Sequence, residues 1–401
     1  MDKLRFLQFS DAHLDAALTH LKLGWPPDKR EQRIREINRL LADLPRLAQE
    51  RQVEAVFIPG DLWDDEAASA DTAATVIETC AALSPIPVFI TPGNHDFYSP
   101  LSFYNPDRAR LRNLPVWPDN VFIFRSEQFQ TIAHPTRPDV SITGRAFHHN
   151  APTEERWLAQ HITRAETPIS ILLFHGSLLT YEGADANLPG KRTAPFSAEE
   201  LVEQNFSYAA LGHYHHYTEL VDVDERIRAA YAGCLAGRGP TEIGLHFILV
   251  GELDAHGVCG ELEKIRLDRR TVYNVVVDVS GATTDTEMRE RIGQHLQASG
   301  ATADDIVYLQ LTGRMRNSLR TAGWIEAFQA RYFYLGVSDQ TRPAYNLETP
   351  HPRTSQGAFI RQMQRQLNAA ANQAERSQCE HAIYYGLDAL LQGEVRPRYE
   401  D

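Results

Sequence analysis

The feature of this sequence that most constrains its fold is a series of short apolar runs, each followed at once by polar residues. The runs lie at residues 4–10, 54–60, 87–93, 169–174 and 208–212. Their length and their content of Val, Ile, Phe and Leu predict buried strands. Helical patterns lie between them at 28–51, at 71–84 behind Asp71, and at 197–205 behind Ser197. Strands that alternate with helices in this way predict an α/β layered domain.

Side chains that commonly bind metals follow each of these strands. In chain order they are Asp11, His13, Asp61, Asp64, Asn94, His95, Asp96, His175, His213 and His215. Because ligands bind at the carboxyl ends of strands in open α/β sheets, these side chains are expected to meet at one edge. Any single motif could be a turn, a helix cap or a buried core histidine. The ordered set of all five motifs predicts a metal site.

The residue types suit a pair of metal ions. Two divalent cations about 4 Å apart need one shared anionic ligand and further donors on each side. Asp61 is the natural bridge between them. The other ligands divide into two groups: Asp11, His13 and His215 for one cation, and Asn94, His175 and His213 for the other. Nitrogen and oxygen donors without a thiolate suit manganese, iron or zinc better than calcium. In an alternating segment His216 points away from His213 and His215, so it is left out.

Composition indicates the cellular compartment and the kind of partner to expect for this protein. No apolar run approaches the roughly 20 residues of a membrane span, and the first residues show no cleavable signal pattern. The four cysteines lie far apart, which indicates neither a zinc ribbon nor a disulfide framework. We therefore expect a cytoplasmic protein without a membrane partner. The net charge of −13 argues against a generally basic nucleic-acid surface, although it allows a local basic groove.

The motifs D-x-H, GD, GNHD, a lone His and GH-x-H, in this order, resemble those of the calcineurin-like metallophosphoesterases. The resemblance covers residues 4 to about 216. It implies a four-layered α/β/β/α sandwich with the two ligand groups given above. It also implies that His95 protonates the leaving oxygen without binding metal and that Asp64 orients His95. Nuclease relatives often place a histidine at the position of Asp64. Such a site hydrolyses phosphoesters by in-line attack of an activated water.

The remaining sequence resembles the SbcD/YhaO-like DNA repair nucleases. Residues 231–257 are similar to their strand-turn region, with Ala-Gly-Cys where they have Pro-Gly-Ser or Pro-Gly-Asn. Residues 271–335 read strand, helix, strand, helix, strand, like their capping domain, although the first helix could be only a structural brace. Residues 381–397 are similar to the end of YhaO-like proteins. The resemblance implies a DNA exonuclease or endonuclease. We expect Mn²⁺ in its site, with Fe²⁺, Zn²⁺ or Mg²⁺ as alternatives.

We expect a nuclease domain at residues 1–268, a capping domain at 269–336, and a linker with partner-binding helices at 337–401. The polar, Pro-bearing segment 337–357 reads as the linker. Two amphipathic helices follow, with apolar stripes formed by Phe359, Ile360, Met363 and Leu367, and by Ile383, Leu387, Leu390 and Leu391. Such short helices cannot bury these stripes alone. They dock on this chain's own domains or, as in SbcD-like relatives, on the coiled-coil base of an SbcC-like ATPase. A homodimer of this chain is a further partner that we consider.

Basic residues near the expected groove could contact phosphate or could be ordinary solvated surface. Arg238, in a Gly-Arg-Gly turn, is the favoured substrate contact. The others are Arg145, Lys191, Arg192, Arg314, Arg316 and Arg320. Two other functions compete with DNA cleavage. One is a small-molecule phosphodiesterase or phosphatase on the same core, and the other is a non-catalytic scaffold without metal.

Overall fold

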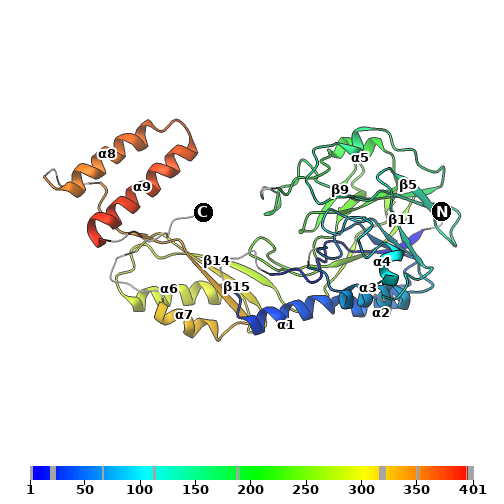
Figure 1. Cartoon of the computed structure of the whole chain (residues 1–401), viewed down its shortest axis with the longest axis horizontal. Helices are drawn as coiled ribbons and strands as arrows, with labels where there is room; N and C mark the ends of the chain where they lie inside the picture. The colour runs from blue at the N-terminus through cyan, green and yellow to red at the C-terminus, as the bar shows by residue number, and fades with distance from the viewer. Residues whose placement is uncertain are drawn as a thin grey trace. The chain divides into compact units, whose positions relative to one another are not determined.

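The computed structural model describes residues 3–18, 24–65, 67–111, 114–186, 188, 190–315, 322–348, 351, 353–393 and 395. Arg316 and Arg320 lie outside the described residues. The chain forms two compact units, Met1–Val272 and Tyr273–Asp401 (Figure 1). The division falls four residues after the expected boundary at 268. The expected capping domain and the two C-terminal helices lie in the same unit rather than in separate ones.

Unit 1 contains two sheets. Within the described residues, the larger one has strands β1 (Leu4–Gln8), β2 (Ala55–Ile58), β3 (Val88–Ile90), β4 (Val121–Ile123), β11 (Ile248–Asp254), β12 (Gly257–Val258) and β13 (Glu263–Ile265). Their order is β12-β11-β1-β2-β3-β4, with β13 beside β11. The run from β1 to β4 is parallel, whereas β11 is antiparallel to β1. Of the parallel run, β1, β2 and β3 are the strands that the apolar runs of the sequence predict, whereas β4 is not among the predicted strands.

The second sheet of unit 1 has the order β5-β6-β7-β8-β10-β9. Its strands are β5 (Gln130–Ala133), β6 (Val140–Gly144), β7 (Ile169–His175), β8 (Tyr208–Gly212), β9 (Thr218–Val221) and β10 (Ile227–Tyr231). The inner strands from β6 through β10 are parallel, and the two edge strands are antiparallel to their neighbours. Strands β7 and β8 thus run the same way and end beside each other.

Alternate residues of the central strands enter different apolar clusters, which defines the layers of unit 1. Ala55 and Phe57 of β2 pack between the two sheets, whereas Val56 and Ile58 pack toward the helices that follow β1 and β2. In β7, Leu173 enters the cluster between the sheets, and its neighbours enter a third cluster that includes Leu201 of α5. This alternation confirms the predicted four-layered α/β/β/α sandwich, with α1 to α3 on one side and α5 on the other (Figure 1).

The helices of unit 1 begin and end where local chemistry requires it. Their bounds are α1 (Pro27–Asn38), the 3₁₀ turn η1 (Leu40–Asp43), α2 (Leu44–Glu50), α3 (Ala70–Ala82), α4 (Pro106–Leu111), η2 (Trp157–Ala159) and α5 (Ala198–Glu203). The single helix expected at 28–51 is wrong. Pro45 lacks an N–H and starts a new helix, so the chain passes through η1. Ser69 rather than Asp71 caps α3, whereas Ser197 caps α5 as predicted.

Unit 2 has the expected order of strands and helices. The three-stranded sheet β14-β15-β17 has α6 and α7 packed on one face through Val307, Leu309 and Leu311 of its central strand. The elements are β14 (Val272–Asp278), α6 (Asp285–Ala298), β15 (Ile306–Thr312), β16 (Arg314–Met315), α7 (Ala322–Gln329), β17 (Tyr334–Asp339) and β18 (Arg342–Pro343). The expected linker at 337–357 is partly wrong, because Val337–Asp339 continue β17 in parallel pairing with β15 and β18 pairs with β16.

The last two helices, α8 (Ser355–Ala369) and α9 (Gln373–Gln392), pack on each other. Their shared cluster includes Ile360, Ile383 and Leu387, together with Tyr345 from the segment before them. The expectation that these helices cannot bury their apolar stripes alone is therefore wrong in part, because each helix covers much of the stripe of the other. Leu390 and Leu391 stay half exposed, at 50% and 48%. None of the helices in the described part of the chain is long and apolar enough to cross a membrane.

The two sheets of unit 1 approach each other closely where β2 and β8 end. A Cβ atom on Gly212 would lie 1.9 Å from the carbonyl oxygen of Pro59. A Cβ atom on Gly60, whose φ is +93°, would lie 2.5 Å from Nδ1 of His175. Neither contact can be tolerated by a larger residue, since backbone or a buried ring stands in the way. These two glycines let the ends of β2, β7 and β8 touch.

We predict that Gly212→Ala separates these strand ends and destabilises unit 1 by about 3 kcal/mol or more, as an overpacked backbone contact does. The measurement is the urea midpoint in metal-free buffer. Gly24→Ala is the matched control, because a methyl group there meets no atom within 4 Å. Equal midpoints for the two variants would show that the close approach of β8 and Pro59 is unimportant.

Candidate metal centre

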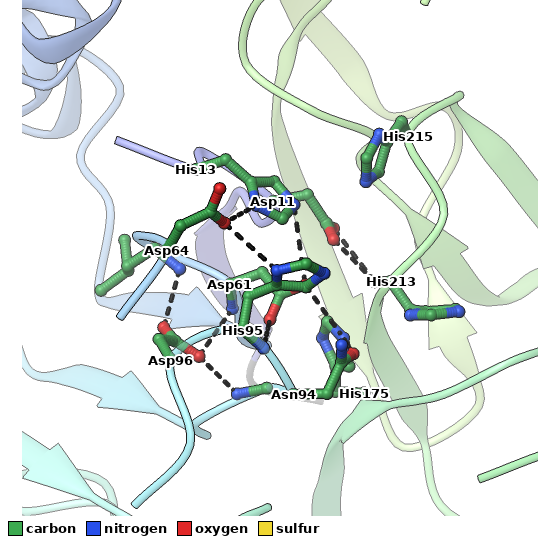
Figure 2. A network of polar contacts seen from close by, with 12 residues as sticks. Asp11, His13, Asp61, Asp64, Asn94, His95, Asp96, His175, His213 and His215 are labelled. Atoms are coloured by element: carbon green, nitrogen blue, oxygen red, sulfur yellow. Dashed lines mark hydrogen bonds and ion pairs between the residues drawn. The ribbon is translucent and has the colours of Figure 1, made fainter. Parts of the chain in front are cut away.

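The predicted site residues gather at the carboxyl ends of β1, β2, β3, β7 and β8 (Figure 2). Asp11, His13, Asp61, His175 and His213 are buried, and His95 is half exposed at 49%. Three groups of ligand atoms from the predicted set each lie within 4.8 Å of one another: Asp11, His13 and His215; Asp11, Asp61 and His175; and His13, Asp64 and His95. The strand ends thus bring together residues that are up to 204 positions apart in the sequence.

Asp61 stands at the middle of the cluster. Its Oδ2 atom lies 3.3 Å from Nε2 of His175 and 3.6 Å from Nε2 of His13, so one oxygen faces both predicted ligand groups. Its Oδ1 atom accepts a hydrogen bond from the backbone N–H of His95 at 2.9 Å. Two positive charges, one on each side of Oδ2, would satisfy this arrangement.

Each predicted histidine ligand has one ring nitrogen held by the protein. Nδ1 of His13 lies 2.6 Å from Asp64, and Nδ1 of His175 lies 2.9 Å from the Pro59 carbonyl. Nε2 of His213 lies 2.5 Å from the Lys191 carbonyl, and Nδ1 of His215 lies 2.6 Å from Glu242. Since carbonyl and carboxylate oxygens only accept, these nitrogens carry the protons. When such a ring is neutral, its opposite nitrogen carries a lone pair, as a metal ligand requires.

Three of the buried polar atoms that have no hydrogen-bond partner within the described part of the chain belong to this cluster. They are Nε2 of His13, Oδ2 of Asp61 and Nδ1 of His213. A buried polar atom without a partner costs about 1–3 kcal/mol, so each of the three requires an explanation. Coordination of cations by these atoms provides one. The donor set therefore fits divalent metal ions.

The electrostatics of the cluster agree with this fit. Burial lowers the pKa of His13 and lowers the pKa of His213 and His215 well below the ordinary histidine value, so these rings are neutral. For His175, burial also opposes the charged form, but the adjacent Asp61 carboxylate outweighs it and raises the pKa to about 9. The space between His175 and Asp61 thus favours positive charge.

Lys191 lies at the edge of the cluster. Its Nζ atom donates to the His213 carbonyl at 2.7 Å and lies 3.0 Å from Nε2 of His215 and 3.8 Å from Asp185. Nε2 of His215 has a single lone pair in its ring plane, so it cannot bind Lys191 and a metal together. Metal coordination by His215 therefore requires the ammonium group to turn toward Asp185.

A buried carboxylate that the sequence reasoning left without a role, Asp96, ties two of the loops together. It accepts hydrogen bonds from the backbone N–H groups of Asp61, Leu62 and Gly93 at 3.0, 2.7 and 2.6 Å. The hydroxyl of Tyr104 donates to it at 2.6 Å. Asp96 thus fixes the loop after β2 against the loop after β3. The motif GNHD contains it, but no pattern in the sequence indicates these partners.

The backbone of the site is strained. Asp11, His13, Asp61 and His213 have φ values of 51°, 43°, 55° and 112°. Non-glycine residues rarely adopt such values, which cost of the order of 1–3 kcal/mol each and persist only where the surrounding structure enforces them. Here the strand ends and the Asp96 hydrogen bonds enforce them. All four strained residues belong to the predicted ligand set.

Asp64 lies between a predicted ligand and the predicted proton donor. The same oxygen, Oδ1, is 2.6 Å from Nδ1 of His13 and 3.3 Å from Nδ1 of His95. Burial lowers the pKa of His95, but Asp61 and Asp64 outweigh this effect and raise it. The expected contact between Asp64 and His95 exists, although Asp64 holds His13 more closely.

The predicted role of Arg238 in binding substrate is not what the structure indicates. Its guanidinium is mostly buried and donates to Glu242 at 2.6 Å, and Nη2 also lies 3.2 Å from Nδ1 of His215. A lone arginine in a glycine turn suggests an exposed contact, but Glu242 lies four residues later and pairs with it. The spacing between Arg238 and Glu242 could have indicated this pairing.

Comparison with known proteins agrees with the geometry of the ligand cluster. A model of the family described as calcineurin-like phosphoesterase matches residues 4–217, which is more than half of the chain. The chain belongs to the calcineurin-like phosphoesterase family. Members of this family use two divalent metal ions. The chain is thus a metallophosphoesterase with a clustered set of metal-ligand residues.

Individual relatives are distant. The chain is 26% identical over 224 residues to the uncharacterized metallophosphoesterase YhaO of Bacillus subtilis (strain 168), a match that covers 53% of this chain. The match spans 48% of the length of that relative, or about half. Among solved structures, a dimetal phosphatase from Danio rerio aligns with 66% of this chain and 99% of its own, at 13% identity and a TM-score of 0.38. The protein TT1561 of Thermus thermophilus aligns with 67% and 100%, at 17% identity and a TM-score of 0.37.

We predict that Asp61→Asn lowers the manganese content from two ions per chain to one or none and abolishes phosphoester hydrolysis. The amide has no negative charge to share between two cations. Metal analysis after gel filtration in Mn²⁺ measures the content. Asp224→Asn, at an exposed position, is the control for the same chemical change. An Asp61→Asn protein with two ions and full activity would contradict the central place of Asp61.

Proposed function

We propose that this chain hydrolyses phosphodiester bonds of DNA, as an exonuclease or endonuclease of DNA repair. The observation that carries the proposal is the position of His95. Its side chain is half exposed beside a buried ligand cluster, so the side of the site where the leaving oxygen departs is open to solvent. An open face admits a polymer whose chain continues in both directions. Two sequence resemblances to SbcD/YhaO-like nucleases, at residues 231–257 and 271–335, support the same substrate.

The proposed ligand roles follow the geometry of the cluster. Asp61 would hold both ions, since its Oδ2 atom faces His13 on one side and His175 on the other. The remaining ligands are Asp11 and His215 with His13, and Asn94 and His213 with His175. When bound, two divalent cations make water a nucleophile at neutral pH and offset negative charge on the phosphoryl oxygens. We propose Mn²⁺ for both positions, because nitrogen and oxygen ligands without thiolate suit it.

His95 acts as the general acid in this proposal. Asp64 faces its Nδ1 atom at 3.3 Å, which leaves Nε2 to give a proton to the departing oxygen. The backbone N–H of His95 is bound to Oδ1 of Asp61, so the backbone that carries the ring is fixed relative to Asp61. No covalent bond to the protein is required.

Lys191 takes the phosphate-binding role that was expected first of Arg238. Once turned from His215, its ammonium group lies beside the ligand cluster and can bind a phosphate oxygen. The Arg238 guanidinium is held by Glu242 instead. A lysine that binds one phosphate gives sequence-independent contact, as a general nuclease requires.

We predict that His95→Ala keeps two metal ions per chain and loses a factor of about 10²–10⁴ in hydrolysis, because a positioned general acid contributes that much. The assay uses labelled single- and double-stranded DNA with Mn²⁺, Mg²⁺ or EDTA, and products are sized on a gel. His256→Ala, at an exposed turn, is the control. Loss of both metals in His95→Ala, or full activity, would contradict the assigned role.

The net charge of −13 favours a second candidate, a phosphodiesterase for small molecules. The same assay separates the two. Cleavage of a chromogenic diester with intact DNA under all metal conditions would support the small-molecule enzyme and overturn the DNA proposal. EDTA-sensitive cleavage of DNA would support the nuclease.

We also propose that α8 and α9 bind the coiled-coil base of an SbcC-like ATPase. The two helices already pack on each other, but Leu390 and Leu391 remain half exposed side by side on α9. Neighbouring exposed leucines near the end of a helix offer an apolar contact to another helix. A homodimer through the same contact would be the competing use of this surface.

We predict that the double substitution Leu390→Glu and Leu391→Glu abolishes co-purification with the ATPase and leaves Mn²⁺-dependent hydrolysis unchanged. Two charges at an apolar helix contact are costly to bury. The control places the same two charges at exposed positions on α9, as Gln373→Glu and Gln378→Glu. Undiminished ATPase binding by the leucine variant would refute the proposal. A dimer of the wild type that the leucine variant loses would assign the surface to self-association.

A further inference from the structure

Glu242 has no role in the sequence motifs of the metal site, yet it contacts one of the proposed ligands directly. It is 5% exposed, and its Oε1 atom lies 2.6 Å from Nδ1 of His215. In the sequence, His215 comes before β9 and Glu242 comes after β10, 27 residues later. A buried carboxylate at this distance from a ring nitrogen fixes both the proton and the orientation of the ring.

Arg238 keeps Glu242 in place as an acceptor. Its Nη2 atom donates to Oε1 of Glu242 at 2.6 Å, and its Nε atom donates to Oε2 at 3.2 Å. The backbone N–H of Arg238 donates to Oε2 at 2.6 Å as well. Both oxygens thus receive hydrogen bonds, and the carboxylate has no proton to offer His215. Nδ1 of His215 lies 2.6 Å from Oε1 of Glu242 and 3.2 Å from Nη2 of Arg238, so its shorter contact is with an acceptor. Nδ1 therefore donates to Glu242, which leaves the lone pair on Nε2.

The turn that carries Arg238 is itself anchored in the core of unit 1. The buried side chain of Arg33, on α1, donates to the carbonyl of Gly237 at 2.7 Å. The same guanidinium forms two hydrogen bonds with Asp268, at 2.9 and 2.6 Å. The turn that carries Arg238 is therefore held in place by buried hydrogen bonds, and so is the carboxylate of Glu242 that Arg238 binds.

Glu242 differs from the groups that hold the other proposed ligands. His175 and His213 are held by backbone carbonyls, which substitution cannot remove. His13 is held by Asp64, which also faces the proposed acid His95. Glu242 lies next to His215 on the side away from the cluster. Its substitution therefore tests the orientation of one ligand without changing the proton donor.

We infer that Glu242, supported by Arg238, is a positioning residue that presents the Nε2 lone pair of His215 to one of two metal ions. The inference rests on the proposed ligand role of His215. It assigns to the pair Arg238–Glu242 the orientation of a ligand instead of contact with DNA. Glu242→Gln should reverse the ring. The backbone N–H and Nε of Arg238 both bind Oε2, so they retain that atom as the oxygen. The new NH₂ group then faces Nδ1 of His215 and displaces Nη2 of Arg238, and the proton moves to Nε2.

The test measures Mn²⁺ binding by titration calorimetry and the protonated ring nitrogen of His215 by ¹⁵N NMR of metal-free protein labelled at histidine. For Glu242→Gln we expect one of the two ions to bind about 10- to 100-fold more weakly, the other to bind as in the wild type, and a proton on Nε2. Glu203→Gln, at an exposed position at the end of α5, is the control and should bind both ions as the wild type does.

Glu242→Asp keeps an acceptor that cannot donate, so it should retain the proton on Nδ1 and bind the ion more tightly than Glu242→Gln. This variant also decides the matter if the glutamine variant does not fold. Equal weakening of both ions, a proton on Nδ1 in Glu242→Gln, or a proton on Nε2 in Glu242→Asp would overturn the inference. Failure of the wild type to cleave DNA would refute the proposed substrate and leave these binding measurements valid.

Discussion

The whole site depends on the close approach of the two sheets of unit 1 at the ends of β2 and β8. Pro59 lies against Gly212, Gly60 lies against Gly93 and His175, and the Pro59 carbonyl accepts the hydrogen bond of His175. The residues that follow these strands therefore extend into the space between the two sheets at this edge. The left-handed backbone of Asp61 is a consequence of this packing. Structural rigidity around the site is what holds such strained residues.

The packing creates an electrostatic requirement as well as a geometric one. Buried carboxylates of Asp11 and Asp61 face imidazole rings that burial keeps neutral, apart from His175. Anionic groups enclosed without counter-charge would be costly, since ions lose their hydration in the interior. Divalent cations would offset this cost and would use the lone pairs that Asp64, Glu242 and two carbonyls leave on the neutral rings. Metal binding is therefore expected to stabilise the fold of this domain.

Much of this arrangement follows from local sequence. Apolar runs predict the strands, and Asp61, Asn94 or His213 directly after a strand predict one shared edge. What depends on long-range folding does not follow. The Lys191 carbonyl that holds His213, and Glu242 that holds His215, lie 22 and 27 residues away in loops of irregular shape. Polar composition is also a poor guide where pairing with a distant strand decides the structure. The segment after residue 337 was expected to be a linker, but its first residues continue β17 beside β15.

The central proposal is that two cations share one oxygen of Asp61 as a ligand. Metal analysis combined with electron paramagnetic resonance tests it most directly. Wild-type protein is depleted of metal, loaded with Mn²⁺ and analysed for metal content and low-temperature electron paramagnetic resonance. Two ions about 4 Å apart with a shared ligand are expected to give two manganese per chain and an exchange-coupled spectrum. One ion per chain, or two that give only the spectrum of isolated Mn²⁺, would contradict the account.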